Sequence, residues 1–183
     1  MPQPPPPRPA TVGPWWLPAP SARRRCGREE GGPRVAGERI LVLNGPNLNL
    51  LGEREPEVYG RTTLAEIEDR VRRRASELSC EVEFAQDNSE GGLVGALQRA
   101  RVRCQGVVLN PGALGHYGLS LRDAISAVRL PVVEVHLSNV HSREPFRHRL
   151  VTAQVALGVV TGLGPSGYVY ALEALLERLR QAG

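Results

Sequence analysis

Lysine is absent from this 183-residue sequence, in which all 23 Lys or Arg positions are arginine. The absence excludes three kinds of chemistry, because Schiff-base catalysis, attachment of pyridoxal phosphate and phosphate binding by a P-loop all use a lysine amine. Long apolar runs are absent too. No stretch approaches the ~18 apolar residues that a transmembrane helix needs, so no such helix is expected.

Cysteine is scarce. Cys26, Cys80 and Cys104 are odd in number and form no CxxC motif, and two of them lie at the edges of predicted strands. A reduced, inert thiol is the common case at such positions. The sequence therefore predicts a reducing, cytoplasmic compartment and no structural zinc.

Charge is unevenly distributed along the chain. Residues 1–39 contain ten of the sixteen prolines, both tryptophans and a net charge of +4, whereas residues 40–183 contain sixteen arginines and sixteen acidic residues. The excess positive charge therefore belongs to the first segment. It gives no reason to expect that the folded domain binds nucleic acid.

Residues 1–38 are rich in Pro, Arg and Gly and show no hydrophobic period. Such a segment has too little apolar surface to offset the entropy lost on ordering. We expect a disordered tail, or sequence translated upstream of the true start, followed by one domain over residues 39–183. A targeting peptide, a PxxP-type ligand and salt-sensitive binding of nucleic acid or membrane stay open as alternatives for the tail.

From Arg39 onward, short apolar segments alternate with amphipathic ones. A capping box between Thr63 and Glu66 opens the first helix, whose apolar residues recur on one face. Strands are predicted at residues 40–44, 80–86, 106–110, 131–136 and 156–161, and the later helices at residues 92–103, 119–128 and 168–180.

This strict alternation predicts parallel strands joined by right-handed crossovers. Five strands fit an α/β, flavodoxin-like parallel sheet of order 2-1-3-4-5 with helices on both faces. In such sheets, ligands bind beyond the carboxyl ends of the strands at the point where the strand order reverses. The site is therefore predicted in the loops after Asn44 and Asn110, next to the loop after His136.

Tyr59 lies in the first of these loops. A free tyrosine, with a pKa near 10, is a poor base at neutral pH, but a nearby guanidinium stabilises the phenolate and lowers that pKa. Arg54 or Arg61 can supply this charge. The alternative is a surface tyrosine that is anchored only by packing.

His116 and His136 follow the third and fourth strands, and Glu134 precedes His136 by two residues. A carboxylate beside an imidazole orients the ring and favours the protonated form that a general acid needs. A structural hydrogen-bonding role is the alternative for each histidine. Metal binding by the pair is disfavoured, since no third ligand has a convincing spacing.

Two further motifs lie nearer the carboxyl terminus. The basic segment 138–150 can receive a carboxylate or a phosphate through its histidines and arginines, or it can form a solvated or subunit-contacting loop. Residues 162–167 have the form GxGxxG, but a dinucleotide site needs a following βα unit with an acidic residue about 20 positions on. The glycines are instead predicted to allow a tight turn and close packing of a helix on the sheet.

Four segments, in this order, resemble type II 3-dehydroquinate dehydratase: LNGPNLNLLGEREPEVYG, LNPGALGHYGLSLRDA, PVVEVHLSNVHSREPFR and GLGPSGY. The match covers about residues 40–182. The resemblance implies a flavodoxin-like fold, no metal or cofactor, and a homododecamer built as a tetramer of trimers. It also implies the anti elimination of water from 3-dehydroquinate, through an enolate, to give 3-dehydroshikimate. This is a step of the shikimate pathway toward chorismate and the aromatic amino acids, and quinate catabolism is an alternative role for the same reaction.

The resemblance also implies catalytic roles. Tyr59 takes the C2 proton, and Arg54 lowers the pKa of that tyrosine and stabilises developing charge. His136 donates a proton to the departing C1 hydroxyl and is supported by Glu134, while Asn47 holds a water at the enolate oxygen.

The resemblance implies six further residues that bind substrate: Asn110, His116, Asp123, Leu137, Ser138 and Arg147. The backbone amides of Leu137 and Ser138 are implied to hold the substrate carboxylate. Residues from about 48 to 59 are expected to form a mobile lid, because Gly52 and Pro56 bracket charge with no apolar anchor.

The sequence departs from the family pattern in two places. Gly115-His116-Tyr117-Gly118 stands where the family commonly has Thr-His-Thr-Ser, so we expect weaker orientation of His116 and no side-chain cap at Gly118. Residues 149–151 replace polar and aromatic residues at an expected trimer contact. Neither departure removes a proposed catalytic group. An active enzyme is the main prediction, and a non-catalytic flavodoxin-like binding or regulatory protein is the alternative.

Overall fold

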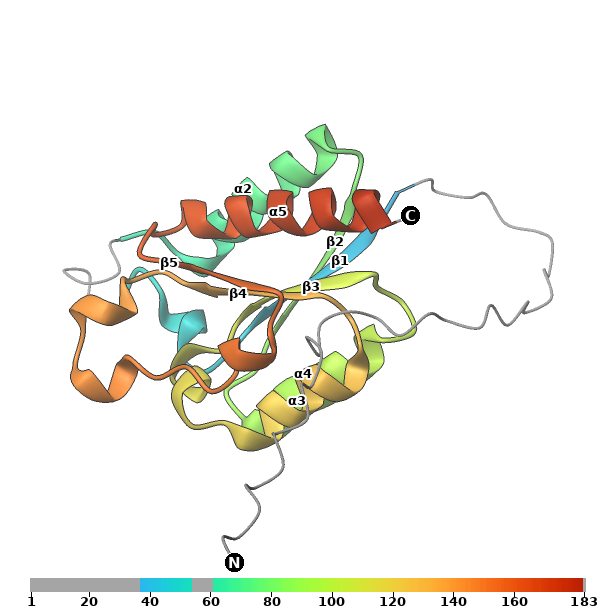
Figure 1. The fold of residues 1–183 in the computed structure, drawn as a ribbon. Coiled ribbons are helices and arrows are strands. Elements are labelled where there is room, and N and C mark those ends of the chain that lie inside the picture. The colour runs from blue at the N-terminus through green and yellow to red at the C-terminus, as the bar shows by residue number, and fades with distance from the viewer. Residues whose placement is uncertain (1–36, 54–60, 183) are drawn as a thin grey trace, which may run out of the picture. The chain divides into compact units, whose positions relative to one another are not determined.

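A computed structural model describes residues 37–53 and 61–182. The described chain forms one parallel sheet of order β2-β1-β3-β4-β5, which confirms the predicted topology (Figure 1). The strands are β1 (Arg39–Asn44), β2 (Glu81–Gln86), β3 (Gly106–Asn110), β4 (Val132–His136) and β5 (Gly158–Thr161).

Helices cover both faces of the sheet. Figure 1 shows α2 and α5 on one face and α3 and α4 on the other. Their bounds are α2 (Leu64–Glu77), α3 (Glu90–Ala100), α4 (Leu119–Val128) and α5 (Ser166–Ala182). No helix of the described residues has the length and apolar character needed to cross a membrane.

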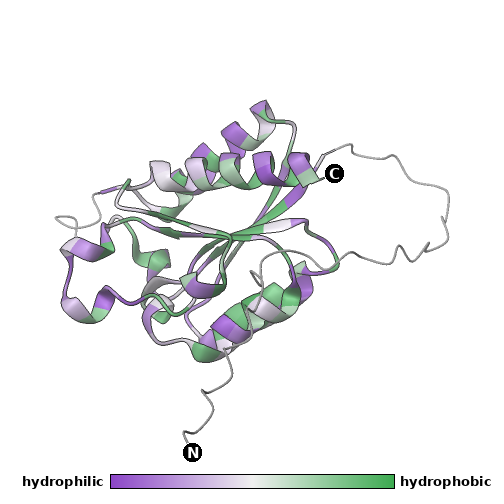
Figure 2. Ribbon diagram, in the orientation of Figure 1, coloured by the Kyte–Doolittle hydropathy of each residue, from purple (hydrophilic) through white to green (hydrophobic). Residues whose placement is uncertain are grey.

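Alternate residues of each central strand supply two separate cores. In β1, Ile40 and Val42 pack with α2 and α5, whereas Leu41 and Leu43 pack with α3 and α4. Strands buried on both faces read as continuous apolar runs, which is the pattern of β1, β3 and β4. Figure 2 shows apolar residues along these strands and hydrophilic ones on the outer sides of the helices.

The first helix begins where its capping box predicts. The Thr63 hydroxyl accepts a hydrogen bond from the Glu66 amide at 3.2 Å, and the Glu66 carboxylate accepts one from the Thr63 amide at 2.8 Å. These bonds satisfy two of the amides that a helix N-terminus leaves without intrahelical partners.

The residues before β1 join the domain at one end of α5. The Arg180 guanidinium donates a hydrogen bond of 2.9 Å to each carboxylate oxygen of Glu38. Residues 1–36 of the predicted disordered tail lie outside the described residues.

The helix α4 has a cap that its own sequence does not supply. Gly118, at the N-cap position, makes no side-chain cap bond, as expected. Instead, Glu90 at the start of α3 accepts a hydrogen bond from the Leu121 amide at 2.9 Å. A Cβ at position 118 would lie 2.8 Å from the Leu114 carbonyl oxygen. The glycine therefore fits a close approach, and a neighbouring helix replaces the lost cap.

Candidate active site

A pocket of about 120 Å³ opens beyond the carboxyl ends of β1, β3 and β4. Three loops build it, each following one of these strands, as expected for the point where the strand order reverses. Seven predicted site residues line the pocket: Asn47, Asn110, His116, His136, Leu137, Ser138 and Arg147.

Glu134 and His136 form a buried polar pair beside the pocket. Glu134 is fully buried and His136 is 6% exposed. Glu134 Oε1 lies 2.6 Å from His136 Nε2. Because the carboxylate is an acceptor, Nε2 carries a proton, and Nδ1 is the ring nitrogen available to a ligand. The pair is therefore suited to hold an imidazole in one orientation.

Gly115 lets the 3-10 helix η2 (Gly112–His116) pack closely against this pair. A Cβ at position 115 would lie 2.9 Å from Pro111 Cγ and 3.2 Å from His136 Cε1. The Gly115 carbonyl accepts hydrogen bonds from the Val151 amide at 2.8 Å and from the Thr152 hydroxyl at 3.3 Å. The segment after residue 149 thus holds η2 in place.

His116 is oriented by backbone, not by hydroxyl groups of its neighbours in sequence. Its Nδ1 lies 3.1 Å from the Arg149 carbonyl oxygen. A carbonyl can only accept, so Nδ1 carries the proton and Nε2 is left as an acceptor. This contact orients His116 although the glycines at positions 115 and 118 have no hydroxyl to do so.

Two arginines bring positive charge to the pocket. Arg147 Nε donates to the Glu144 carboxylate at 2.9 Å, and Arg143 contacts the Ser138 hydroxyl at 3.3 Å. The side chains are largely buried, with exposures of 23% and 18%. The sequence placed Arg143 only within a basic segment. Its position in the pocket depends on the turn at residues 138–143, which charge pattern alone does not reveal.

The loop after β1 is held by Asn88, a residue that no sequence motif singles out. Asn47 adopts a left-handed backbone with φ of 66°, and its amide donates to Asn88 Oδ1 at 2.9 Å. Gln86 donates to the same oxygen at 2.9 Å. Asparagine tolerates left-handed backbone better than most residues. The pocket wall at Asn47 is thereby tied to the end of β2.

The GxGxxG motif supports the site from the side of β5. Gly162 and Gly164 have φ values of +82° and +57°, and their amides donate to the carbonyls of His136 and Leu137 at 3.2 and 3.0 Å. A Cβ at Gly167 would meet Val135 and Val160 at 3.4 Å. The motif forms the tight turn and close helix–sheet contact that its glycines predict.

Comparison with known proteins decides the family. The model for class II dehydroquinase matches residues 38–176, most of the chain. This chain belongs to the class II dehydroquinase family. A relative named 3-dehydroquinate dehydratase from Chelativorans sp. (strain BNC1) is 58% identical over 141 residues, which cover 76% of this chain and 97% of the relative. Another of that name, from Halothermothrix orenii, is 52% identical over 143 residues, or 78% and 97% of the two chains.

Solved structures agree. The crystal structure of a type II dehydroquinase from Butyrivibrio crossotus matches with a TM-score of 0.75 and 40% identity, over 76% of this chain and 97% of that one. The corresponding values for the enzyme from Propionibacterium acnes are 0.74 and 41%, over 77% and 97%. The architecture of this class II dehydroquinase is thus that of its family.

Four predicted site residues do not line the described pocket. One of them, Glu134, is buried beside His136, which does line it. Arg54 and Tyr59 lie outside the described residues, as does the lid prediction beyond residue 53. Asp123 is described, but it does not line the pocket. Its side chain is 76% exposed and pairs with Arg122 at 3.1 Å.

The stability of the protein is expected to fall as His116 becomes protonated. Burial lowers the pKa of His116, against a smaller opposing effect of the Arg149 carbonyl. The unfolded chain, with a histidine pKa near 6.5, therefore takes up a proton at a higher pH than the folded chain does. Above about pH 6.5, His116 makes its full contribution to the free energy of unfolding. This contribution is lost as pH falls through the lower pKa of the folded state.

Urea titrations at pH 7.5 and 5.5 check this expectation. The wild type should lose more stability between the two pH values than His116→Gln does, while the exposed His141→Gln should behave as the wild type. Equal losses in all three proteins would contradict the prediction.

Proposed function

We propose that the chain catalyses the dehydration of 3-dehydroquinate to 3-dehydroshikimate by anti elimination through an enolate. The observation that carries the proposal is the buried Glu134–His136 pair, whose histidine lines the pocket of a class II dehydroquinase together with Arg143 and Arg147. The names of the relatives give the substrate. The pair supplies an acid matched to a hydroxide leaving group.

The reaction begins with removal of a proton from C2. Tyr59, as the phenolate, takes this proton, and the C–H electrons move to form an enolate whose charge rests on the ketone oxygen. Arg54 stabilises the phenolate and the developing charge. Asn47, on the pocket wall, holds a water that donates to the enolate oxygen.

Loss of water then completes the elimination. The enolate electrons re-form the ketone and the C1–C2 double bond as the C1–O bond breaks. His136 transfers its Nδ1 proton to the departing oxygen, which leaves as water. The cycle closes when the proton held by Tyr59 returns to His136. Glu134 supports the step because its carboxylate lies 2.6 Å from the other ring nitrogen.

The substrate is bound through its carboxylate and through its ring hydroxyls. The amides of Leu137 and Ser138, just past β4, receive the carboxylate, and Arg147 binds ring hydroxyls. Asn110 and His116 complete the contacts from the loop after β3. All five residues line the pocket.

We propose a homododecamer built from four trimers as the active assembly. The exposed position of Asp123 supports this, since a substrate-binding role for it requires a neighbouring copy. Exposed apolar side chains just before, on and just after the edge strand β5 offer surface for subunit contacts: Leu157, Val159 and Leu163. A cytoplasmic location is supported by two buried free cysteines, Cys80 and Cys104, in the two separate cores.

Turnover of 3-dehydroquinate by the purified full-length chain tests the activity. The conjugated enone of the product should give rising ultraviolet absorbance, and Tyr59→Phe, purified in the same way, should give none. Borohydride added with substrate should not inactivate the wild type, because the chain has no lysine to form a Schiff base. A folded wild type that binds the substrate without turnover would instead support the non-catalytic alternative.

A further inference from the structure

A chain of hydrogen bonds lies behind the pocket, on the face of the sheet covered by α5. Tyr168 donates from its hydroxyl to Asn44 Oδ1 at 2.7 Å, and Asn110 Nδ2 donates to the same hydroxyl at 2.8 Å. The two asparagines end β1 and β3 and are paired in the sheet. All three side chains are buried, with exposures between 0% and 3%.

The direction of the bond between Asn110 and Tyr168 is determined. The Gly112 amide, which can only donate, lies 3.1 Å from Asn110 Oδ1. Asn110 must therefore turn its NH₂ group toward Tyr168. One of the two Nδ2 hydrogens binds the tyrosine hydroxyl, and the second has no hydrogen-bond partner among the described residues. Asn110 also lines the pocket.

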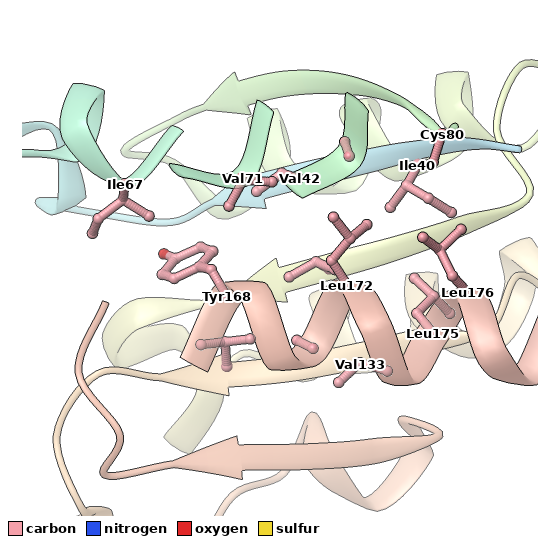
Figure 3. Packing of buried hydrophobic residues seen from close by; sticks show 14 of the residues in the cluster. Ile40, Val42, Ile67, Val71, Cys80, Val133, Tyr168, Leu172, Leu175 and Leu176 are labelled. Atoms are coloured by element: carbon pink, nitrogen blue, oxygen red, sulfur yellow. The ribbon is translucent and has the colours of Figure 1, made fainter. Parts of the chain in front are cut away.

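The tyrosine hydroxyl is not needed to fill the core. Tyr168 is surrounded by an apolar cluster that includes Ile67, Val71 and Leu172, and Figure 3 shows its ring among these side chains at the start of α5. A phenylalanine would satisfy such packing, whereas a buried hydroxyl is costly unless it is hydrogen-bonded. The hydroxyl here joins α5 to the ends of two strands, one of which carries a pocket residue.

We propose that Tyr168 is a positioning residue for the dehydration: its hydroxyl fixes the Asn110 amide so that the second Nδ2 hydrogen donates to a substrate hydroxyl oxygen. The proposal rests on the proposed function. Burial raises the pKa of Tyr168, so the residue stays protonated and acts through Asn110. The Asn110 amide therefore recognises a hydrogen-bond acceptor on the substrate.

Replacement of Tyr168 by phenylalanine tests the proposal. The expected result is a rise in KM for 3-dehydroquinate of about five- to tenfold, as for one lost hydrogen bond, with a smaller change in kcat. Tyr170→Phe is the matched control, because Tyr170 lies on the same helix and is 50% exposed. Its KM should equal that of the wild type.

A double-mutant cycle separates positioning from general stabilisation. In an Asn110→Ala background, Tyr168→Phe should change KM no further, because the amide that it orients is gone. Additive effects, or a lower Tm with KM unchanged, would overturn the proposal.

If Tyr168→Phe does not fold, Asn44→Ala removes the other end of the same chain without touching a residue that lines the pocket. It too should raise KM, and an unchanged KM in this variant would overturn the proposal. A wild type without turnover would instead refute the proposed function itself, so the two failures are distinguishable.

Discussion

Replacing His136 with glutamine is expected to lower kcat by about 10²- to 10⁴-fold, the range for loss of a general acid. Hydroxide is a poor leaving group, so breaking the C1–O bond depends on a proton delivered as the bond breaks. Glutamine has no proton that it can release at neutral pH. Its amide can still donate to Glu134, which lies 2.6 Å from the native ring nitrogen, so the buried carboxylate keeps a partner.

Steady-state kinetics with 3-dehydroquinate, together with thermal unfolding of each variant, measure this effect. KM should change much less than kcat, because the interaction is made with the departing oxygen in the transition state. His141→Gln is the matched control, since His141 is exposed and does not line the pocket. A His136→Gln protein that retains more than a tenth of the wild-type kcat would exclude the assigned role.

The fold was predictable because its local and global signals agree. The buried strands β1 and β3 are continuous apolar runs, and the capping box at Thr63 marks a helix that the structure starts at the next residue. Consistency of this kind is what allows one sequence to specify one structure. Boundaries were less accurate: the last predicted strand begins two residues later than expected, at Gly158.

The location of the site was also predictable, because the topology alone selects the loops after Asn44, Asn110 and His136. The supporting contacts were not. Glu90 caps α4 from another helix, Asn88 holds the Asn47 loop, and both contacts join segments about 30 to 40 residues apart. Hydrophobic period and motif spacing report neighbours within one element. They carry no information on which polar side chain reaches a distant backbone amide.

Loss of the Glu134 charge is expected to have the second large effect. Glu134→Gln should lower kcat at neutral pH by about 10²-fold or more, by analogy with replacing the acid that orients a catalytic histidine by its amide. The native carboxylate accepts a hydrogen bond from Nε2 at 2.6 Å, which leaves Nδ1 available to the substrate. A neutral amide of the same shape can present its NH₂ group to Nε2, which selects the wrong tautomer of the ring.

A comparison of kcat with KM and Tm distinguishes this role from a packing role. Glu134→Gln should lower kcat while KM and Tm stay close to the wild-type values, because the ring stays in place but is held as the wrong tautomer. Glu83→Gln, on the edge strand β2, is the matched control and should keep the wild-type kcat. A Glu134→Gln protein with a lower Tm and an unchanged kcat would assign Glu134 to packing alone.

The surroundings of Glu134 explain why the fold should tolerate the change. Its other oxygen, Oε2, is buried and has no hydrogen-bond partner among the described residues. His136 is therefore the main partner of this carboxyl group, and an amide of the same shape fits the fold but does not support proton donation.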